Sequence, residues 1–174
     1  LNLALGKPTS SSGYENVGTK SENATDGLLD TRWSSRFMDG EWLTIDLQNT
    51  YAVNRVKLYW EAAYATHFDI QLSTDGVEYT TAYTATDAEG GTQDIILPNG
   101  PTEARYVRIF CHQRNTGYGS SLYEVEVYGV RRPTALENTY SEDNQLPHLI
   151  LRNGQIYIMH KAKIYHISGQ LLQE

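Results

Sequence analysis

The loop formed by residues 23–31 carries the side chains best suited to bind a metal ion. Calcium takes about six to eight oxygen ligands, and a loop that turns sharply while presenting a carboxylate, a hydroxyl and several carbonyls supplies them. The segment from Asn23 to Thr31 is such a loop, with a turn at Asp26-Gly27. The same residues also occur in ordinary surface turns, and the loop by itself favours that simpler interpretation.

Sequence motifs of catalysis are absent. The chain has no Gly-x-Ser-x-Gly elbow, no phosphate-binding glycine loop and no His-Glu-x-x-His pattern. Two carboxyl groups about 5–10 Å apart are enough for glycoside hydrolysis, and the chain has 21 acidic residues. However, an acid that stays protonated needs an apolar pocket, and the candidate acids lie on open loops. We therefore expect a binding module that is not an enzyme by itself.

Cysteine and histidine form no credible zinc set in the sequence. Cys111 continues the strand predicted at residues 105–110 and is expected to be a buried thiol. His160 and His166 have the wrong spacing to join it on one surface. A single cysteine also excludes an internal disulfide, so the fold must depend on its core or on a metal.

The composition is that of a globular protein with one main domain. The chain has 174 residues, of which 40% are hydrophobic and 20% charged, and its net charge is −7. This charge makes nucleic acid and anionic membranes poor partners, because both attract basic surfaces. No apolar run approaches the roughly 18 residues that would span a bilayer.

Alternating apolar residues, rich in Tyr, Thr, Val and Ile, predict an all-β protein. No segment has a helical stripe longer than two turns, and Asp75-Gly76 suits a type I′ hairpin turn. Seven or eight short strands separated by turn signals indicate a β-sandwich. The predicted strands are residues 42–47, 54–60, 68–72, 77–83, 93–97, 105–110 and 123–128.

The composition changes after Gly129. Residues 1–129 are predicted to form the main domain, and residues 130–147 are polar and are predicted to be a linker. In residues 148–174 we expect a tail of three very short strands at 149–151, 155–159 and 163–167. The first of its turns is expected at Asn153-Gly154. So small a tail cannot be stable alone, and it must dock elsewhere or stay mobile.

Several motifs in one order resemble the discoidin, or coagulation factor 5/8 type C, domains. They lie at residues 2–8, 23–27, 31–33, 42–47, 73–76, 105–108 and 121–129. Within that superfamily, residues 60–65 and 117–124 look most like carbohydrate-binding module family 32, which is usually attached to bacterial glycoside hydrolases. The resemblance covers about residues 2–129. It implies an eight-stranded, galactose-binding-domain-like jelly roll with ligand loops at one end. The tail resembles, more weakly, C-terminal sorting segments of secreted Bacteroidetes proteins.

This resemblance also implies that the loop at residues 23–31 binds a structural calcium ion. It implies that Asp26 and Glu124 supply carboxylates and that Thr31 supplies its hydroxyl and carbonyl. Two carboxylates match the charge of the ion, which would tie an early loop to a late strand. Backbone carbonyls are expected from three further residues: Asn23, Leu28 and Tyr123.

Sugar ligands are held by aromatic faces and by directed hydrogen bonds from charged groups. Loop residues can make these contacts, whereas Trp33, Trp42 and Trp60 are expected in the core. Because Glu61 directly follows a predicted strand, it is the first choice for a hydrogen-bond acceptor. The expected ligand-binding residues are Glu15, Arg36, Phe37, Glu61, Tyr64, Arg114 and Tyr118, and Tyr14 has a similar position.

The carboxylates favour a particular ligand. Glu15 and Glu61, with Asp39 and Glu41 nearby in sequence, would attract an ammonium group such as that of a glucosamine-containing glycan. Galactose and N-acetylhexosamine remain open alternatives. By resemblance, the expected function is to target an attached glycoside hydrolase, of chitobiase or hexosaminidase type, to glycans. The expected location is secreted, periplasmic or cell-surface.

A second hypothesis is an adhesion module that binds a protein or membrane surface, as other discoidin relatives do. Phe37 and Met38 beside Arg36 offer a small apolar tip. The net charge of −7 opposes docking on anionic lipid, so no membrane partner is expected.

Overall fold

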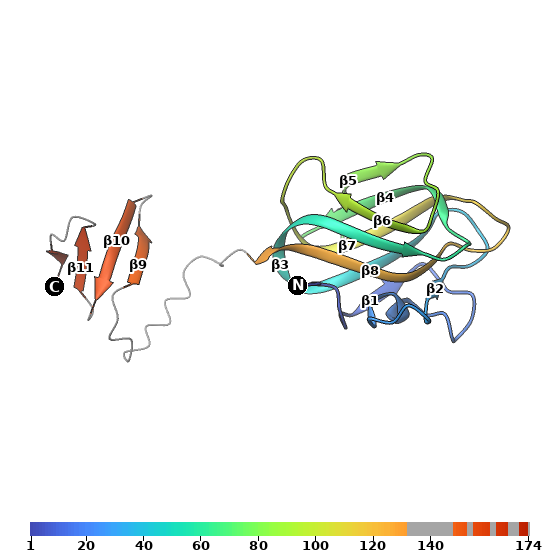
Figure 1. Ribbon diagram of the computed structural model, residues 1–174, viewed down its shortest axis with the longest axis horizontal. Helices are drawn as coiled ribbons and strands as arrows, with labels where there is room; N and C mark the ends of the chain where they lie inside the picture. Colours follow the sequence, from blue (N-terminus) through green and yellow to red (C-terminus); the bar gives the residue numbers. More distant parts are fainter. Residues whose placement is uncertain (132–147, 153–154, 161–162, 167–170, 174) are drawn as a thin grey trace. The chain divides into compact units, whose positions relative to one another are not determined.

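The computed structural model describes residues 1–131, 148–152, 155–160, 163–166 and 171–173 (Figure 1). The chain divides into two compact units, Leu1–Arg132 and Pro133–Glu174. Within the part of the chain that the structure describes, no helix has the length and apolar character needed to cross a membrane. Most of the predicted linker, residues 132–147, lies outside the described residues, but Val130 and Arg131 belong to the last strand of the first unit.

The first unit is a β-sandwich, as predicted. A short 3₁₀ helix, η1 (Ser21–Thr25), precedes β2 and accompanies eight strands. The strands are β1 (Thr9–Ser11), β2 (Trp33–Ser34), β3 (Glu41–Trp60), β4 (Ala65–Ser73), β5 (Thr80–Ala85), β6 (Thr92–Ile96), β7 (Thr102–Arg114) and β8 (Ser121–Arg131).

Strand β3 belongs to both layers of the sandwich. Its first part pairs with β1 and β7, and β7 continues through β4 to β5. Its second part pairs with β6 and β8, and β8 pairs with β2. In Figure 1, β3 runs the length of the unit with β7 and β8 beside it. The inward side chains of both layers form one core.

The structure corrects the prediction of two separate strands at 42–47 and 54–60. They form one strand, which bends where the pairing with β7 shifts register between Asp46 and Tyr51. Gln48 adopts a left-handed backbone conformation at this bend, with φ of 64°, and its N–H donates to Asp46 Oδ1 at 2.8 Å. A side-chain acceptor two residues earlier turns the chain locally without breaking the strand.

The predicted core alternation is confirmed. The side chains that face inward in the segments 43–47, 56–60 and 68–72 are all buried, and Trp33 and Cys111 are buried as well. Trp42 is the exception, because it alternates with buried Leu43 and so points to the outer face of β3. There it is half-buried and Arg108 stacks on its ring, 4.9 Å from the ring centroid. Expecting Trp42 in the core was therefore wrong.

The predicted hairpin is formed by β4 and β5, which pair from Phe68 with Ala85 to Leu72 with Thr80. The turn between them is not type I′, since that turn needs positive φ at both central residues and only Gly76 has it. Asp75 instead accepts hydrogen bonds from the backbone N–H groups of Val77 and Glu78 at 2.8 and 3.0 Å. The longer connection delays the start of β5 to Thr80.

The second unit contains a four-stranded antiparallel sheet. The strands are β9 (His148–Arg152), β10 (Gln155–His160), β11 (Lys163–His166) and β12 (Leu171–Gln173), in the order β12-β11-β10-β9. Three of these strands match the predicted ones, whereas β12 was not predicted. The expected turn at Asn153-Gly154 lies outside the described residues.

Candidate functional site

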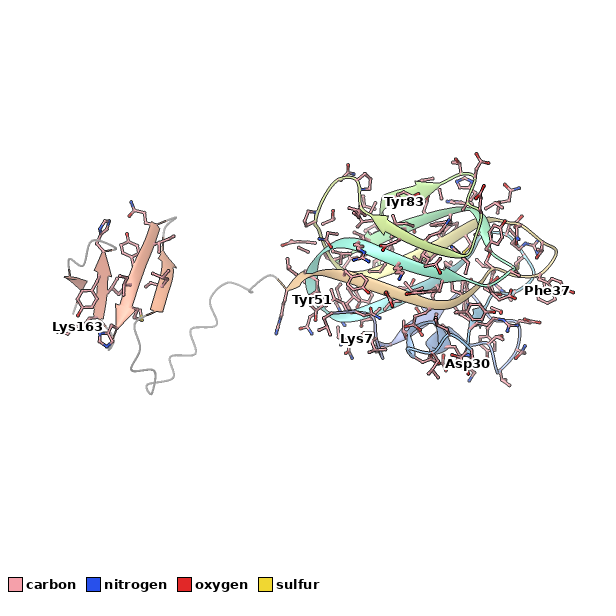
Figure 2. All side chains as sticks on the ribbon, viewed as in Figure 1. Lys7, Asp30, Phe37, Tyr51, Tyr83 and Lys163 are labelled. Carbon is pink, nitrogen blue, oxygen red and sulfur yellow. The ribbon has the colours of Figure 1, made fainter. Side chains whose placement is uncertain are left out.

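The predicted ligand residues lie on loops that are bonded to one another at one end of the first unit. Phe37 projects at that end, whereas Tyr51 lies at the other (Figure 2). The loop at residues 35–40 is anchored to the ends of two long strands. Ser35 N–H donates to Ser120 O at 2.9 Å, and Gly40 N–H donates to Cys111 O at 2.9 Å. The loop conformation is thus set by the sheet and not by the loop sequence alone.

An open cavity of about 440 Å³ lies beside this loop. Three of the predicted residues line it together with Tyr14, and the full lining is Tyr14, Glu15, Asn16, Arg36 and Phe37. The Glu15 loop is fixed by a hydrogen bond from Glu15 N–H to Ser34 O at 2.9 Å. Phe37 and Tyr14 are each about half exposed, which leaves aromatic surface at the cavity rim. Asn16 was not predicted, and its polar type in a Gly- and Asn-rich loop gave no specific signal.

Phe37 does not stand alone. Its ring meets the ring of Tyr118 edge to face, with centroids 5.6 Å apart, although Tyr118 is 65% exposed. Arg114 shapes the Tyr118 loop by donating to the carbonyls of Gly117 and Tyr118, both at 3.2 Å. Two exposed aromatic rings therefore form one surface, and the arginine behind them is a positioning residue.

Glu61 and Tyr64 are joined to the same loop cluster through Asn115. The side chain of Asn115 accepts from Tyr64 N–H at 2.9 Å and donates to Ala62 O at 2.9 Å. Glu61 follows the last residue of β3, as predicted, and one of its carboxylate oxygens accepts from Ala63 N–H at 2.8 Å. Asn115 was missed because its role depends on a partner 51 residues away.

The charge distribution differs from the predicted acidic cluster. Glu41 is buried and binds Arg36 at 2.7 Å, while Asp39 binds Arg114 at 2.9 Å. The hydrogen bond from Arg114 lowers the pKa of Asp39 despite some opposing burial. Two of the four carboxylates are thus already neutralised by arginines of this chain. Glu15 and Glu61 remain as the acidic groups that a ligand can use.

Gly119 allows the close approach that positions Phe37. A Cβ added to Gly119 would meet Ser35 O, and would lie 2.6 Å from Ser35 Oγ and 2.8 Å from Arg36 O. Gly119→Ala is expected to lower the free energy of unfolding by about 2 kcal/mol through overpacking and to displace the Phe37 loop. The matched control is Gly117→Ala, because a Cβ there meets nothing within 4 Å. Equal chemical denaturation midpoints for the two variants would contradict this packing account.

Three of the predicted calcium ligands, Asp26, Thr31 and Glu124, lie close together. Asp26 Oδ2 accepts from the Thr31 hydroxyl at 2.7 Å, and Asp26 Oδ1 accepts from Leu28 N–H at 2.9 Å. Gly27 N–H donates to Glu124 Oε2 at 3.2 Å, which joins this loop to β8 across 97 residues. The side chain of Asn23 closes the loop by donating to the carbonyls of Gly18 and Arg32 at 2.9 and 3.0 Å.

Glu124 has the properties expected of an ion ligand. It is buried, and its Oε1 has no hydrogen-bond partner among the described residues. Burial is the main reason that its pKa rises from 4.5 to about 7, and the nearby Asp26 carboxylate adds to the increase. Tyr123 is the extra residue of a bulge against β3, because Tyr59 pairs with Glu124 and Trp60 pairs with Leu122. A bulge takes a residue out of the ladder, which suits a backbone carbonyl ligand. The donor set fits calcium.

The β-sandwich with a cluster of bonded loops at one end is the architecture of a binding module. A model of the F5/8 type C domain matches residues 7–125. The chain therefore belongs to the F5/8 type C domain family, and the resemblance seen in the sequence is confirmed.

Solved relatives include carbohydrate-binding modules. Chitosan-binding module 1 of a chitosanase/glucanase from Paenibacillus sp. IK-5 is 44% identical, with 74% of this chain and 99% of that chain covered and a TM-score of 0.71. Module 2 of the same enzyme, solved with chitotriose, is 42% identical, with 74% and 100% covered and a TM-score of 0.71. These relatives are non-catalytic modules. The first unit is likewise a binding module and not itself an enzyme.

A longer relative is a polysaccharide lyase 8 family protein, HylA, of Enterococcus faecalis. It is 31% identical over 124 residues, which are 67% of this chain and 9% of that protein. The chain thus spans about a tenth of the length of this curated relative. A segment similar to this module therefore forms a small part of a much longer protein of the polysaccharide lyase 8 family.

Proposed function

We propose that the first unit binds glycans that contain amino sugars, such as oligomers of glucosamine. The observation that carries this proposal is the exposed pair Phe37 and Tyr118 beside a cavity that Glu15 lines. An aromatic surface packs on the apolar face of a sugar ring, and a carboxylate attracts an ammonium group. The 44% identity to a chitosan-binding module supports the same ligand class.

The module's role in this proposal is to direct an attached catalytic domain to its substrate. The Paenibacillus modules belong to a chitosanase/glucanase, and the Enterococcus relative is a lyase. A glycoside hydrolase of chitobiase or hexosaminidase type is the attached domain that we propose, since such enzymes act on amino-sugar glycans. Because those polymers are outside the cell, we propose a secreted, periplasmic or cell-surface location.

We also propose that calcium occupies the loop around Asp26. The ion would be held by the carboxylates of Asp26 and Glu124, by Thr31, and by the carbonyls of Asn23, Leu28 and Tyr123. It supplies positive charge between two carboxylates and satisfies the unpartnered Glu124 Oε1. Its role is structural, because it fixes a loop next to η1 to strand β8 and takes no part in chemistry.

Calorimetric titration of the intact chain with glucosamine oligomers, N-acetylglucosamine oligomers and galactose tests the ligand proposal. Saturable binding is expected for glucosamine oligomers, and we expect Glu15→Gln to weaken it about 10-fold, since Glu15 lines the cavity and this change removes the charge and keeps the shape. Binding to the neutral sugars should be much weaker. The matched control is Glu103→Gln, a substitution on β7 outside the site.

Two outcomes would overturn the assignment. Equal affinity for acetylated and free amino sugars would show that the carboxylates do not recognise an ammonium group, although the module would still bind sugars. No heat with any of the three ligands would favour adhesion to a protein or membrane surface through the exposed tip of Phe37 and Met38.

A further inference from the structure

Three metal-ligating side chains converge on the outer face of the layer that contains β4 and β7. They are His67 and Asp69 of β4 and His112 of β7, none of which belongs to the glycan site or the calcium loop. One ligand atom from each lies within 4.8 Å of the others. His112 Nε2 and Asp69 Oδ2 are 2.9 Å apart, and the rings of His67 and His112 are tilted by 36° with their centroids 4.4 Å apart.

Backbone register creates this convergence. His67 and Asp69 are two residues apart on β4, so both point away from the core, in which Phe68 is buried. The pairing of β4 with β7 shifts between His67 and Phe68, where His67 pairs with Gln113 and Phe68 pairs with Cys111. His112 is therefore the extra residue of a β-bulge, a feature that frequently redirects a side chain toward a site.

The carboxylate of this cluster is held in a defined orientation. Asp69 is buried, and its Oδ1 accepts from the Thr84 hydroxyl of β5 at 2.6 Å. Thr81 donates to Asp69 Oδ2 at 3.4 Å. Burial opposes ionisation of Asp69, but the hydrogen bonds from Thr84 and His112 outweigh it and lower the pKa of this carboxyl group. An oriented carboxylate beside two imidazoles is a typical set of ligands for a divalent transition metal.

We propose that His67, Asp69 and His112 form a binding site for one divalent transition-metal ion of the zinc class. Zinc binds imidazole nitrogen and carboxylate oxygen at about 2.0–2.2 Å, so tetrahedral ligand atoms lie about 3.3 Å apart. The separations of 2.9 Å and at most 4.8 Å reach this value by small side-chain rotations. The ion replaces the proton between His112 and Asp69, and the partial exposure of His112 leaves one coordination position open to solvent.

The ligand atoms of this site differ from those of the calcium loop, because only one of its three ligand groups offers oxygen. Calcium prefers about six to eight oxygen ligands, whereas two of the three groups here are imidazoles. Titration of the full chain with zinc chloride in excess calcium chloride therefore excludes any contribution from the calcium loop. We expect saturable binding and a rise of about 5 °C or more in the melting temperature at zinc concentrations 100-fold above Kd.

Substitutions localise the ion. His67→Gln and His112→Gln are each expected to weaken zinc binding by at least about 100-fold. Thr84→Val, which removes only the hydroxyl that orients Asp69, is expected to weaken it about 10-fold. The matched control replaces the other three histidines of the chain, His148, His160 and His166, with Gln, and should leave the affinity unchanged.

Cobalt(II) provides a second readout that does not depend on stability. A low-coordinate nitrogen and oxygen site gives visible d–d absorption, which should appear with the wild type and be lost in His112→Gln. Absence of saturable zinc and cobalt binding to the wild-type chain would overturn the proposal. Binding that persists in both β-sheet histidine variants but disappears in the triple tail variant would also overturn it, because the ion would then lie in the tail.

Discussion

Removal of calcium is expected to lower the unfolding free energy of the wild-type protein and to leave that of Glu124→Gln unchanged. Glu124 is buried with one carboxylate oxygen unpartnered, and Asp26 lies close enough to raise its pKa. A bound cation removes both penalties, and at 100-fold excess over Kd it contributes about 2.7 kcal/mol. Glutamine keeps the size of the side chain and removes the charge that the ion needs.

The metal-free state should also show a pH dependence that comes from Glu124. Its pKa in the folded protein, about 7, lies above the value of 4.5 for an unperturbed carboxyl group. The folded state therefore favours the protonated form, and this stabilisation is complete below about pH 4.5 and is lost as the pH rises to 7. The loss is as much as about 3 kcal/mol. At pH 8, metal-free Glu124→Gln should consequently be more stable than the metal-free wild type.

Urea denaturation of both proteins at several pH values, with excess calcium or with EDTA, measures these effects. The wild type in EDTA should lose stability between pH 4.5 and 7 relative to Glu124→Gln, and calcium should restore it. Glu103→Gln is the control, because Glu103 lies on β7 and pairs in register with Ala52 of β3. An equal response of wild type and Glu124→Gln to calcium would exclude Glu124 as a ligand.

Phe37→Ala is expected to reduce glycan affinity by at least about 30-fold, an effect of about 2 kcal/mol. The ring lines the cavity and is also the edge-to-face partner of Tyr118, so its removal breaks the aromatic surface in two places. Because Phe37 is half exposed, the substitution should change the melting temperature very little. Titration calorimetry with glucosamine oligomers measures the loss.

Two comparisons separate stacking from general disruption of the loop. Phe37→Tyr keeps the ring and should retain most of the affinity, whereas Met38→Ala removes the neighbouring apolar side chain and should have little effect. If Met38→Ala reduced affinity as much as Phe37→Ala, the loop as a whole would be needed and the aromatic face would have no special role. Tyr118→Ala should give a smaller loss than Phe37→Ala, since Tyr118 does not line the cavity.

The order of apolar residues was enough to predict most of the fold. Strict alternation in residues 43–47 and 68–72 identifies the buried face of two strands, since side chains of a strand point to opposite sides in turn. The same alternation places Trp42 outside the core, a consequence missed by treating a large aromatic residue as buried. The order of the family motifs also brought Asp26 and Glu124 together in prediction, and the structure joins them through Gly27.

Only the tertiary structure shows which charged side chains contact one another. Arg114 and Asp39 are 75 residues apart, and their ion pair removes one carboxylate from the apparent acidic cluster. Likewise Asp69 and His112 are 43 residues apart and meet because β4 pairs with β7. Hydrophobic periodicity identifies the buried face of a strand but not its partner strand or the register of pairing, so it cannot predict these contacts.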